Sequence, residues 1–219
     1  MSSALPRSAR GRPPDPDLEA RVLAATLDLY GEVGWAGFNF DVLARRARVG
    51  KAALYGKWGS KERLIVAALT AWRTSQPPYV ESGSLRRDLT ELAARILSTY
   101  LGHGGAVMLR AQLEAKVYPE LFGAAMEDLQ RQRKQAGRSI VLGAIERGEL
   151  PACTSPALVL DAVAGIITNH VLTTPPDKMA ALTKRSAEYA ETVADFVLTA
   201  AGYRPPASTE APGIAVDPG

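Results

Sequence analysis

Cysteine and histidine are nearly absent from this sequence, and that scarcity excludes several kinds of site. Cys153 is the single cysteine, so no disulfide can form within the chain and no cysteine-based zinc site is possible. The two histidines, His103 and His170, lie far apart in the chain, and we expect no metal centre and no cofactor. One free cysteine is typical of a protein from a reducing compartment.

Long apolar segments are also lacking. The N-terminus has no apolar run of the kind found in a secretory signal peptide. No segment is expected to reach the roughly 18 apolar residues that a membrane-spanning helix needs. The sequence therefore predicts a cytoplasmic protein that does not associate with membranes.

Positive charge is confined to one part of the chain. Residues 1–63 contain 11 Lys and Arg against 7 Asp and Glu, whereas the remaining residues contain 15 against 16. The net charge is therefore +4 in the first segment and −1 in the second. A basic segment attached to a nearly neutral one favours a polyanionic partner for that segment alone.

The two ends of the chain lack the apolar residues that folding requires. Residues 1–16 begin with a proline- and arginine-rich stretch, which we predict to be a flexible basic arm carrying Arg7, Arg10 and Arg12. Such an arm suits a narrow DNA minor groove. Residues 204–219 are rich in proline, alanine and glycine and are predicted to be a disordered tail.

Strand-like alternation is not found between these ends, and nearly every long segment has helical periodicity. The predicted fold class is all-α, with a first domain at residues 17–63 and a larger helical domain at residues 64–203. Beyond the first domain, the helices are expected at residues 60–73, 84–101, 105–117, 119–147, 156–173 and 178–201.

Three short helices joined by tight turns occupy the first domain. Gly34 is expected to end the first helix, Asn39 to cap the second and Ser60 to cap the fourth. The third helix, "KAALYGKW" at residues 51–58, combines small residues with cations and aromatics. This organisation is typical of a helix-turn-helix motif, here at about residues 39–58, whose second helix enters the major groove of DNA.

The residue types of the third helix suit that role. Small side chains such as Ala52 let the helix backbone approach DNA closely. Lys51 and Lys57 can reach base edges or phosphates, and Tyr55 and Lys61 can donate to phosphates. Trp58 is expected to pack in the core. Each exposed charge can alternatively belong to an ordinary solvated helix face, as can the basic run at residues 131–138.

Residues 21–69 resemble the DNA-binding domain of TetR-family transcriptional regulators. The resemblance is carried by four short patterns: Gly34-Trp35, "LARRARV" at residues 43–49, "KAALYGKW" at residues 51–58 and "SKERL" at residues 60–64. By position it implies phosphate contacts from Asn39, Tyr55 and Lys61. It also implies groove contacts from Phe40, Lys51, Ala52 and Lys57.

Four residues depart from the family pattern, and two of them, Phe38 and Gly50, stand where hydroxyl residues are common. Arg48 stands in the turn where glycine is usual, and a non-glycine residue with positive φ costs roughly 1 kcal/mol. Asp41, near the start of the second helix, cannot hold a phosphate but can cap the helix or accept from a cytosine amine. The preferred DNA sequence is therefore open.

The last two predicted helices are strongly apolar. They can form half of a four-helix dimer interface, or they can complete the core of one chain. The resemblance implies a homodimer through these helices, which places the two DNA-reading helices about 34 Å apart on a palindromic operator in double-stranded DNA.

The resemblance also implies a pocket for a largely apolar small-molecule effector within the second domain. His170 lies in an otherwise apolar helix, so it needs a polar partner, which can be a ligand, a neighbouring side chain or the dimer mate. The candidate lining residues are Trp72, Tyr100, His103, Met108, Gln112, Tyr118, Met126, Asn169 and His170.

Three functions were compared on this basis. The favoured one is a ligand-responsive, DNA-binding transcriptional repressor. An all-α enzyme for a small apolar substrate is disfavoured because the sequence offers no convergent nucleophile, base or metal set. A non-specific DNA-binding protein is disfavoured because a net charge of +3 is small for a chain of 219 residues.

Overall fold

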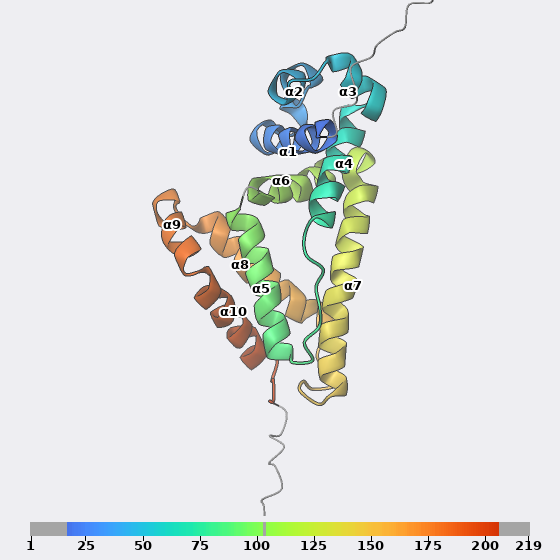
Figure 1. The fold of residues 1–219 in the computed structure, drawn as a ribbon. Helices are drawn as coiled ribbons and strands as arrows, with labels where there is room; N and C mark the ends of the chain where they lie inside the picture. The colour runs from blue at the N-terminus through green and yellow to red at the C-terminus, as the bar shows by residue number, and fades with distance from the viewer. Residues whose placement is uncertain (1–16, 103, 206–219) are drawn as a thin grey trace, which may run out of the picture. The chain divides into compact units, whose positions relative to one another are not determined.

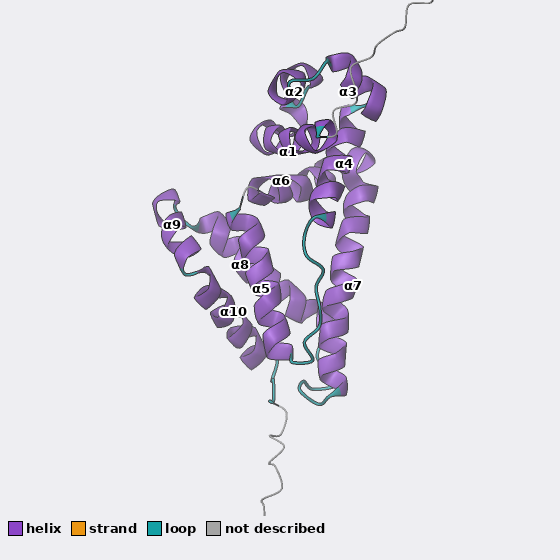
Figure 2. Cartoon of the chain, viewed as in Figure 1, coloured by secondary structure: helices purple, strands orange, loops and turns teal. Residues whose placement is uncertain are grey.

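The computed structural model describes residues 17–102 and 104–205, and this part of the chain is all-α as predicted. It divides into two compact units, the first ending at Ser75 and the second beginning at Gln76. Within the described residues each unit consists of helices and loops (Figures 1 and 2). The arm residues Arg7, Arg10 and Arg12 lie outside the described residues.

The first unit contains α1 (Leu18–Gly37), α2 (Phe40–Ala47), α3 (Lys51–Trp58) and α4 (Lys61–Thr74). Helix α1 packs along α4, and α2 packs on both α1 and α3. Burial of large apolar side chains drives this packing because it removes apolar surface from water. The largest fully buried side chains are Leu29, Tyr30, Phe38, Leu43, Leu54, Leu64 and Ile65.

The helix ends in this unit follow the expected capping chemistry. The side chain of Asn39 accepts a hydrogen bond from the amide of Val42 at 2.9 Å, and that of Ser60 accepts from Arg63 at 3.4 Å. Gly34 was expected to end the first helix; its φ of 66° does interrupt α1 there, but the helix continues to Gly37. Arg48 adopts the left-handed conformation (φ 56°, ψ 47°) that the turn requires.

The second unit contains α5 (Leu85–Leu101), α6 (Gly104–Val117), the π-helical segment η1 (Pro119–Gly123), α7 (Ala124–Glu146), α8 (Pro156–Thr173), α9 (Pro176–Lys184) and α10 (Ser186–Ala200). Helix α5 packs against both α8 and α10, and α7 covers another side of α8. The core between them is purely apolar at its centre and includes Leu89, Leu97, Val163, Ile167 and Val197.

Glu149 is a buried carboxylate, 2% exposed, that joins distant parts of the second unit. Its side chain accepts hydrogen bonds from the amide of Leu85 at 3.2 Å and from the guanidinium of Arg147. Its backbone carbonyl accepts from the amide of Arg204 at 2.8 Å. Because the two side-chain bonds satisfy the carboxylate, its burial is tolerated.

Two predicted helices differ from the structure. The segment at 178–201 is not one helix, because Arg185 leaves the helical conformation (φ −104°, ψ 16°) between α9 and α10. Its guanidinium instead forms a two-bond ion pair with Glu188 in the first turn of α10. The segment at 119–147 begins with the wider π-helical turns of η1 before α7 starts.

Helix α8 differs from expectation in another respect. Its 18 residues have a mean hydropathy of 1.4, so length and composition alone match a membrane span, although none was predicted. Helix α8 packs against α5, α7 and α10, although only 22% of its residues are buried within this chain.

Candidate nucleic-acid interface

Helices α2 and α3 are held together by a small buried contact. Leu43 and Ala47 of α2 and Leu54 of α3 are fully buried, and Trp58 is 8% exposed at the end of α3. Packing of these residues fixes the inner side of α3 and leaves its other residues in solvent. This arrangement is a helix-turn-helix, with α3 in the position of the DNA-reading helix.

The exposed side of α3 carries little side-chain bulk. Ala52, Ala53 and Gly56 are all exposed, and a Cβ atom added at Gly56 would meet no other atom within 4 Å. A helix surface of this kind permits close approach of its backbone to a large partner.

Lys51, the first residue of α3, is paired with an acid on α2. Its ammonium lies 2.9 Å from the carboxylate of Asp41, and both side chains are about half exposed. The hydrogen bond from Lys51 to Asp41 raises the pKa of the ammonium. The pair therefore presents a donor and an acceptor side by side at the N-terminal ends of α2 and α3.

Lys57, in the last turn of α3, is paired with a residue much earlier in the chain. Its ammonium lies 2.7 Å from the carboxylate of Glu19 at the start of α1 and 5.2 Å from the centre of the Trp58 indole. Thirty-eight positions separate Lys57 from Glu19, so no local sequence pattern indicated this contact.

Tyr55 and Phe40 occupy different environments. The Tyr55 ring is 51% exposed on α3, whereas Phe40 is only 4% exposed. The two rings meet edge to face with their centres 4.6 Å apart. Phe40 was predicted as a groove contact, but its buried ring presents almost no surface and instead supports Tyr55.

Lys61 lies at the N-terminus of α4 and turns toward α1. Its ammonium donates to the carbonyl of Trp35 at 3.1 Å and to that of Phe38 at 3.5 Å, and lies 3.7 Å from the centre of the Trp35 ring. These contacts fasten the end of α1 to α4. A phosphate must compete with them for the ammonium.

A third ion pair links α1 to α2. Arg46 donates two hydrogen bonds to the carboxylate of Glu32, at 2.9 and 2.7 Å. The guanidinium lowers the pKa of the Glu32 carboxyl, and the carboxylate raises the pKa of Arg46. Both groups are exposed, so water competes for them and weakens the ion pair.

The predicted effector residues are dispersed. Trp72 belongs to α4 of the first unit, and Asn169 is exposed on α8. Tyr100 of α5 is half-buried, and its phenolic oxygen accepts from the hydroxyl of Thr168 at 3.3 Å. Met108, Gln112 and Tyr118 are half-buried around α6. His103 and the side chain of Met126 lie outside the described residues.

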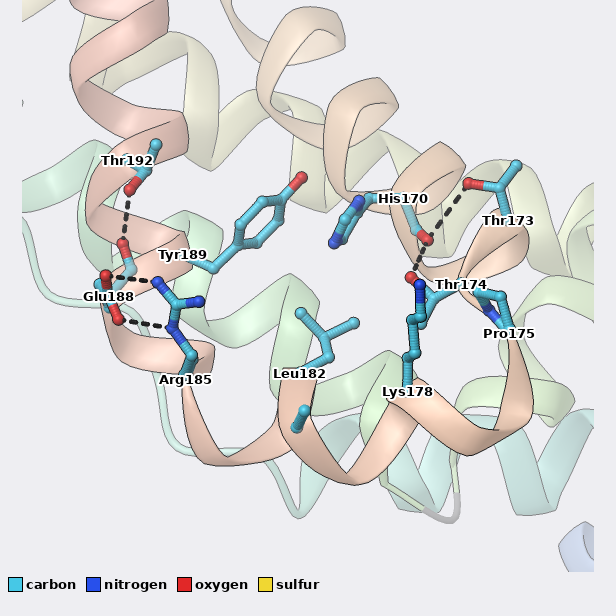
Figure 3. A pocket seen from close by; sticks show the side chains of 11 residues that line it. His170, Thr173, Thr174, Pro175, Lys178, Leu182, Arg185, Glu188, Tyr189 and Thr192 are labelled. Carbon is cyan, nitrogen blue, oxygen red and sulfur yellow. Dashed lines mark hydrogen bonds and ion pairs between the residues drawn. The ribbon is translucent and has the colours of Figure 1, made fainter.

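An open cleft of about 540 Å³ lies between the C-terminal end of α8, helix α9 and the start of α10. His170 and Tyr189 both line it; Figure 3 shows their side chains pointing toward each other, and the rings stack with centres 4.4 Å apart. Leu182 and the Arg185–Glu188 ion pair also line it. Of the predicted effector residues that the structure describes, His170 alone lines this cleft.

The sequence indicated that His170 needs a polar partner, but it did not indicate that its ring stacks on that of Tyr189. The stacking depends on how α8 meets α10, which periodicity does not indicate. Within the described residues, no cluster of three or more His, Cys, Asp or Glu side chains is placed to hold a metal ion.

Two sequence families match the chain. Residues 22–68 match the family described as bacterial regulatory proteins, tetR family. Residues 80–197 match the family described as tetracyclin repressor-like, C-terminal domain.

Individual relatives and solved structures agree with these matches. The HTH-type transcriptional regulator AqdR of Rhodococcus erythropolis is 28% identical over 151 residues, covering 69% of this chain and 72% of that protein. The DNA-binding transcriptional repressor TetR of Mycobacteroides abscessus is 27% identical, covering 69% of this chain and 80% of that one. A TetR transcriptional regulator of Agrobacterium tumefaciens has the same fold, with a TM-score of 0.64 and 21% identity over 84% of this chain and 93% of that chain.

Proposed function

Because the chain belongs to the TetR family of transcriptional regulators, we propose that it is a homodimeric repressor that a small-molecule effector releases from a palindromic operator. The observation that carries the proposal is the exposed side of α3. It combines small residues with Lys51, Tyr55 and Lys57, while its other side is buried against α2.

The proposed DNA contacts follow from exposure. Lys51 and Ala52 face base edges, because the N-terminal residues of a DNA-reading helix reach the bases. Asn39, Tyr55 and Lys57 contact phosphates through their polar groups. The arm at residues 1–16, with Arg7, Arg10 and Arg12, contacts the minor groove. Lys61 contacts a phosphate only if its ammonium gives up its hydrogen bonds to the carbonyls of Trp35 and Phe38.

The proposed dimer forms through α8 and α10. Both helices leave large apolar side chains in water, with Leu158 at 70%, Leu172 at 64% and Phe196 at 66% exposure. Covering these side chains with the same helices of a second copy removes apolar surface from water in both chains. Two-fold symmetry of the protein then matches a palindromic operator.

The proposed effector site lies in the second unit, and we expect its ligand to be largely apolar. Half-buried Tyr100, Met108, Gln112, Tyr118 and His170 are its candidate contacts. Repression as the direction of control is supported by the relative from Mycobacteroides abscessus, which is named as a repressor. An effector acts by binding more tightly to a conformation that does not fit the operator.

We further propose that residues 17–63 bind DNA and that residues 64–203 bind the effector and form the dimer. The protein acts in the cytoplasm and without catalysis. The names of its relatives as transcriptional regulators support both statements.

Selection of bound duplexes from a random DNA pool by the full chain tests the proposal, combined with mass measurement of the complex. We expect a palindrome whose half-sites lie about 34 Å apart, bound by two copies. Salt-sensitive binding without a motif would instead indicate a non-specific DNA-binding protein. Absence of DNA binding would refute the proposal.

A further inference from the structure

The Lys51–Asp41 ion pair combines two features that a simple phosphate contact does not need. Lys51 is the first residue of α3, and Asp41 lies in the first turn of α2, so both are near the N-terminal ends of the helix-turn-helix. Their charged groups are 2.9 Å apart, and both side chains are accessible, at 46% and 60% exposure. An acid in this position repels phosphates, and it is Asn39 that caps α2, so Asp41 is available for a contact with a base.

The donor and the acceptor of this ion pair are complementary to the acceptors and the donor of one base pair. In the major groove, guanine presents the acceptors O6 and N7, and cytosine presents the N4 amine as a donor. O6 and N4 are themselves joined by a base-pairing hydrogen bond, so they lie about 2.9 Å apart. The ammonium and the carboxylate are separated by the same distance.

On the basis of the proposed function, we infer that Lys51 and Asp41 act together to read one G·C base pair in each half-site. Lys51 donates to O6 and N7 of guanine, while Asp41 accepts from N4 of its cytosine. The ion pair stays intact during this contact, since the two groups address neighbouring atoms of the same base pair.

The electrostatics of the pair favour reading bases over binding phosphates. Alone, Asp41 would be repelled by the phosphate backbone, and Lys51 would bind any phosphate within reach. Paired, they are nearly neutral and gain little from a phosphate, so their contribution depends on the base edge. The pair therefore adds specificity more than affinity.

An A·T pair is a poorer match. In its major groove, the N6 donor of adenine lies between two acceptors, N7 of adenine and O4 of thymine. The methyl group of thymine lies next to O4. The ammonium then finds no two adjacent acceptors. Discrimination by one such contact is expected to be about 5- to 150-fold.

The test compares DNA selection by the full-length protein with selection by Asp41→Ala and Lys51→Ala. Alanine is compatible with both helices, and melting temperature and dimer mass check that each variant is folded. The two substitutions change net charge in opposite directions. Asp41→Ala is expected to raise affinity for random DNA and Lys51→Ala to lower it.

Both variants are nevertheless expected to lose the G·C preference at the same symmetric position, leaving less than about threefold discrimination there. Glu32→Ala is the matched control. It breaks the Arg46 ion pair in the same unit without touching α3, and it should leave the selected sequence unchanged.

The outcomes separate the inference from the proposed function. A palindrome whose G·C preference at one position disappears in both variants supports the inference. A palindrome that both variants select unchanged, or an A·T preference at the affected position, overturns the inference and leaves the DNA-binding regulator intact. If the unmodified protein selects no DNA, the proposed function fails and the inference fails with it.

Discussion

The two units expose different kinds of surface. The accessible side of α3 carries small and charged side chains, and the ion pairs Lys51–Asp41 and Lys57–Glu19 join it to other helices. Helices α8 and α10 expose large apolar side chains instead, including Leu158 and Phe196. Exposed charge suits a polyanion, and exposed apolar surface suits a second protein, so the contrast indicates two separate partners.

The apolar surface of the second unit should give the largest effect. Phe196→Asp places a charge where we propose contact between the two copies. Burying one phenylalanine is worth about 1.5–3 kcal/mol, and a symmetric dimer contains two. The dissociation constant of the dimer should therefore rise at least about a hundredfold, as measured by analytical ultracentrifugation.

Val80→Asp is the matched control for that experiment. Val80 is 77% exposed but lies in the loop before α5. The same charge added there should leave the dimer unchanged. Equal dissociation constants for the two variants would remove α10 from the interface.

Replacing one glycine in each unit by alanine should change the stability of the protein in opposite directions. A Cβ atom at buried Gly105 would lie 2.2 Å from the carbonyl oxygen of Tyr100, because α6 begins directly against the end of α5. Gly105→Ala should therefore lower the free energy of unfolding by about 3 kcal/mol. Gly56→Ala, on open α3, should raise it by about 0.5–1 kcal/mol. Denaturant titration measures both.

Gly56→Ala should also weaken operator binding, by about 1–3 kcal/mol, because the added methyl group lies on the surface that approaches DNA. A variant that is stabler and binds DNA as tightly as the unmodified protein would contradict close approach of α3.

Freeing the ammonium of Lys57 should change the affinity of the first unit for DNA without changing its base preference. Glu19→Gln frees this ammonium in the last turn of α3, away from the N-terminal residues that reach bases. An exposed pair of this kind is worth about 0.2–1 kcal/mol. Affinity for operator and random DNA should rise by the same few-fold factor, and the salt dependence should steepen. A changed base preference in DNA selection would place Lys57 at the bases instead.

The smallest effect concerns Glu32. Hydrogen bonds from Arg46 lower the pKa of its carboxyl below the ordinary value of 4.5. The resulting stabilisation is present above pH 4.5 and is lost as the pH falls through the lowered pKa. Titration followed by NMR should give a Glu32 midpoint below 4.5, and Arg46→Gln should return it toward that value. Identical midpoints would mean that the pair does not persist in solution.

Sequence reasoning was most successful where local chemistry decides the structure. Asn39 and Ser60 cap helices as predicted, since a cap depends on residues within one turn. Arg48 takes the left-handed conformation because α3 must follow α2 through a tight turn. Phe40 and Lys61 were harder to place, since their environments depend on how α2 and α4 pack on α1.

In the second unit, periodicity predicted most helices but gave no reliable pocket. The break at Arg185 was missed because neither glycine nor proline marks it; the Arg185–Glu188 contact accompanies it. Tyr100 and His170 were grouped as ligand contacts, yet their described partners are Thr168 and Tyr189. These contacts join different helices, so they follow from the packing and have no local sequence signal.

Glu149 has a consequence for the order in which the chain folds during its synthesis. Its bonds reach back to Leu85 and forward to Arg204. The second unit therefore cannot complete its structure until nearly the whole chain has left the ribosome. The first unit ends at Ser75, and it can fold while the rest is still being made. Each nascent copy thus displays a finished DNA-reading helix before it can acquire the surface through which we propose that it pairs with a second copy.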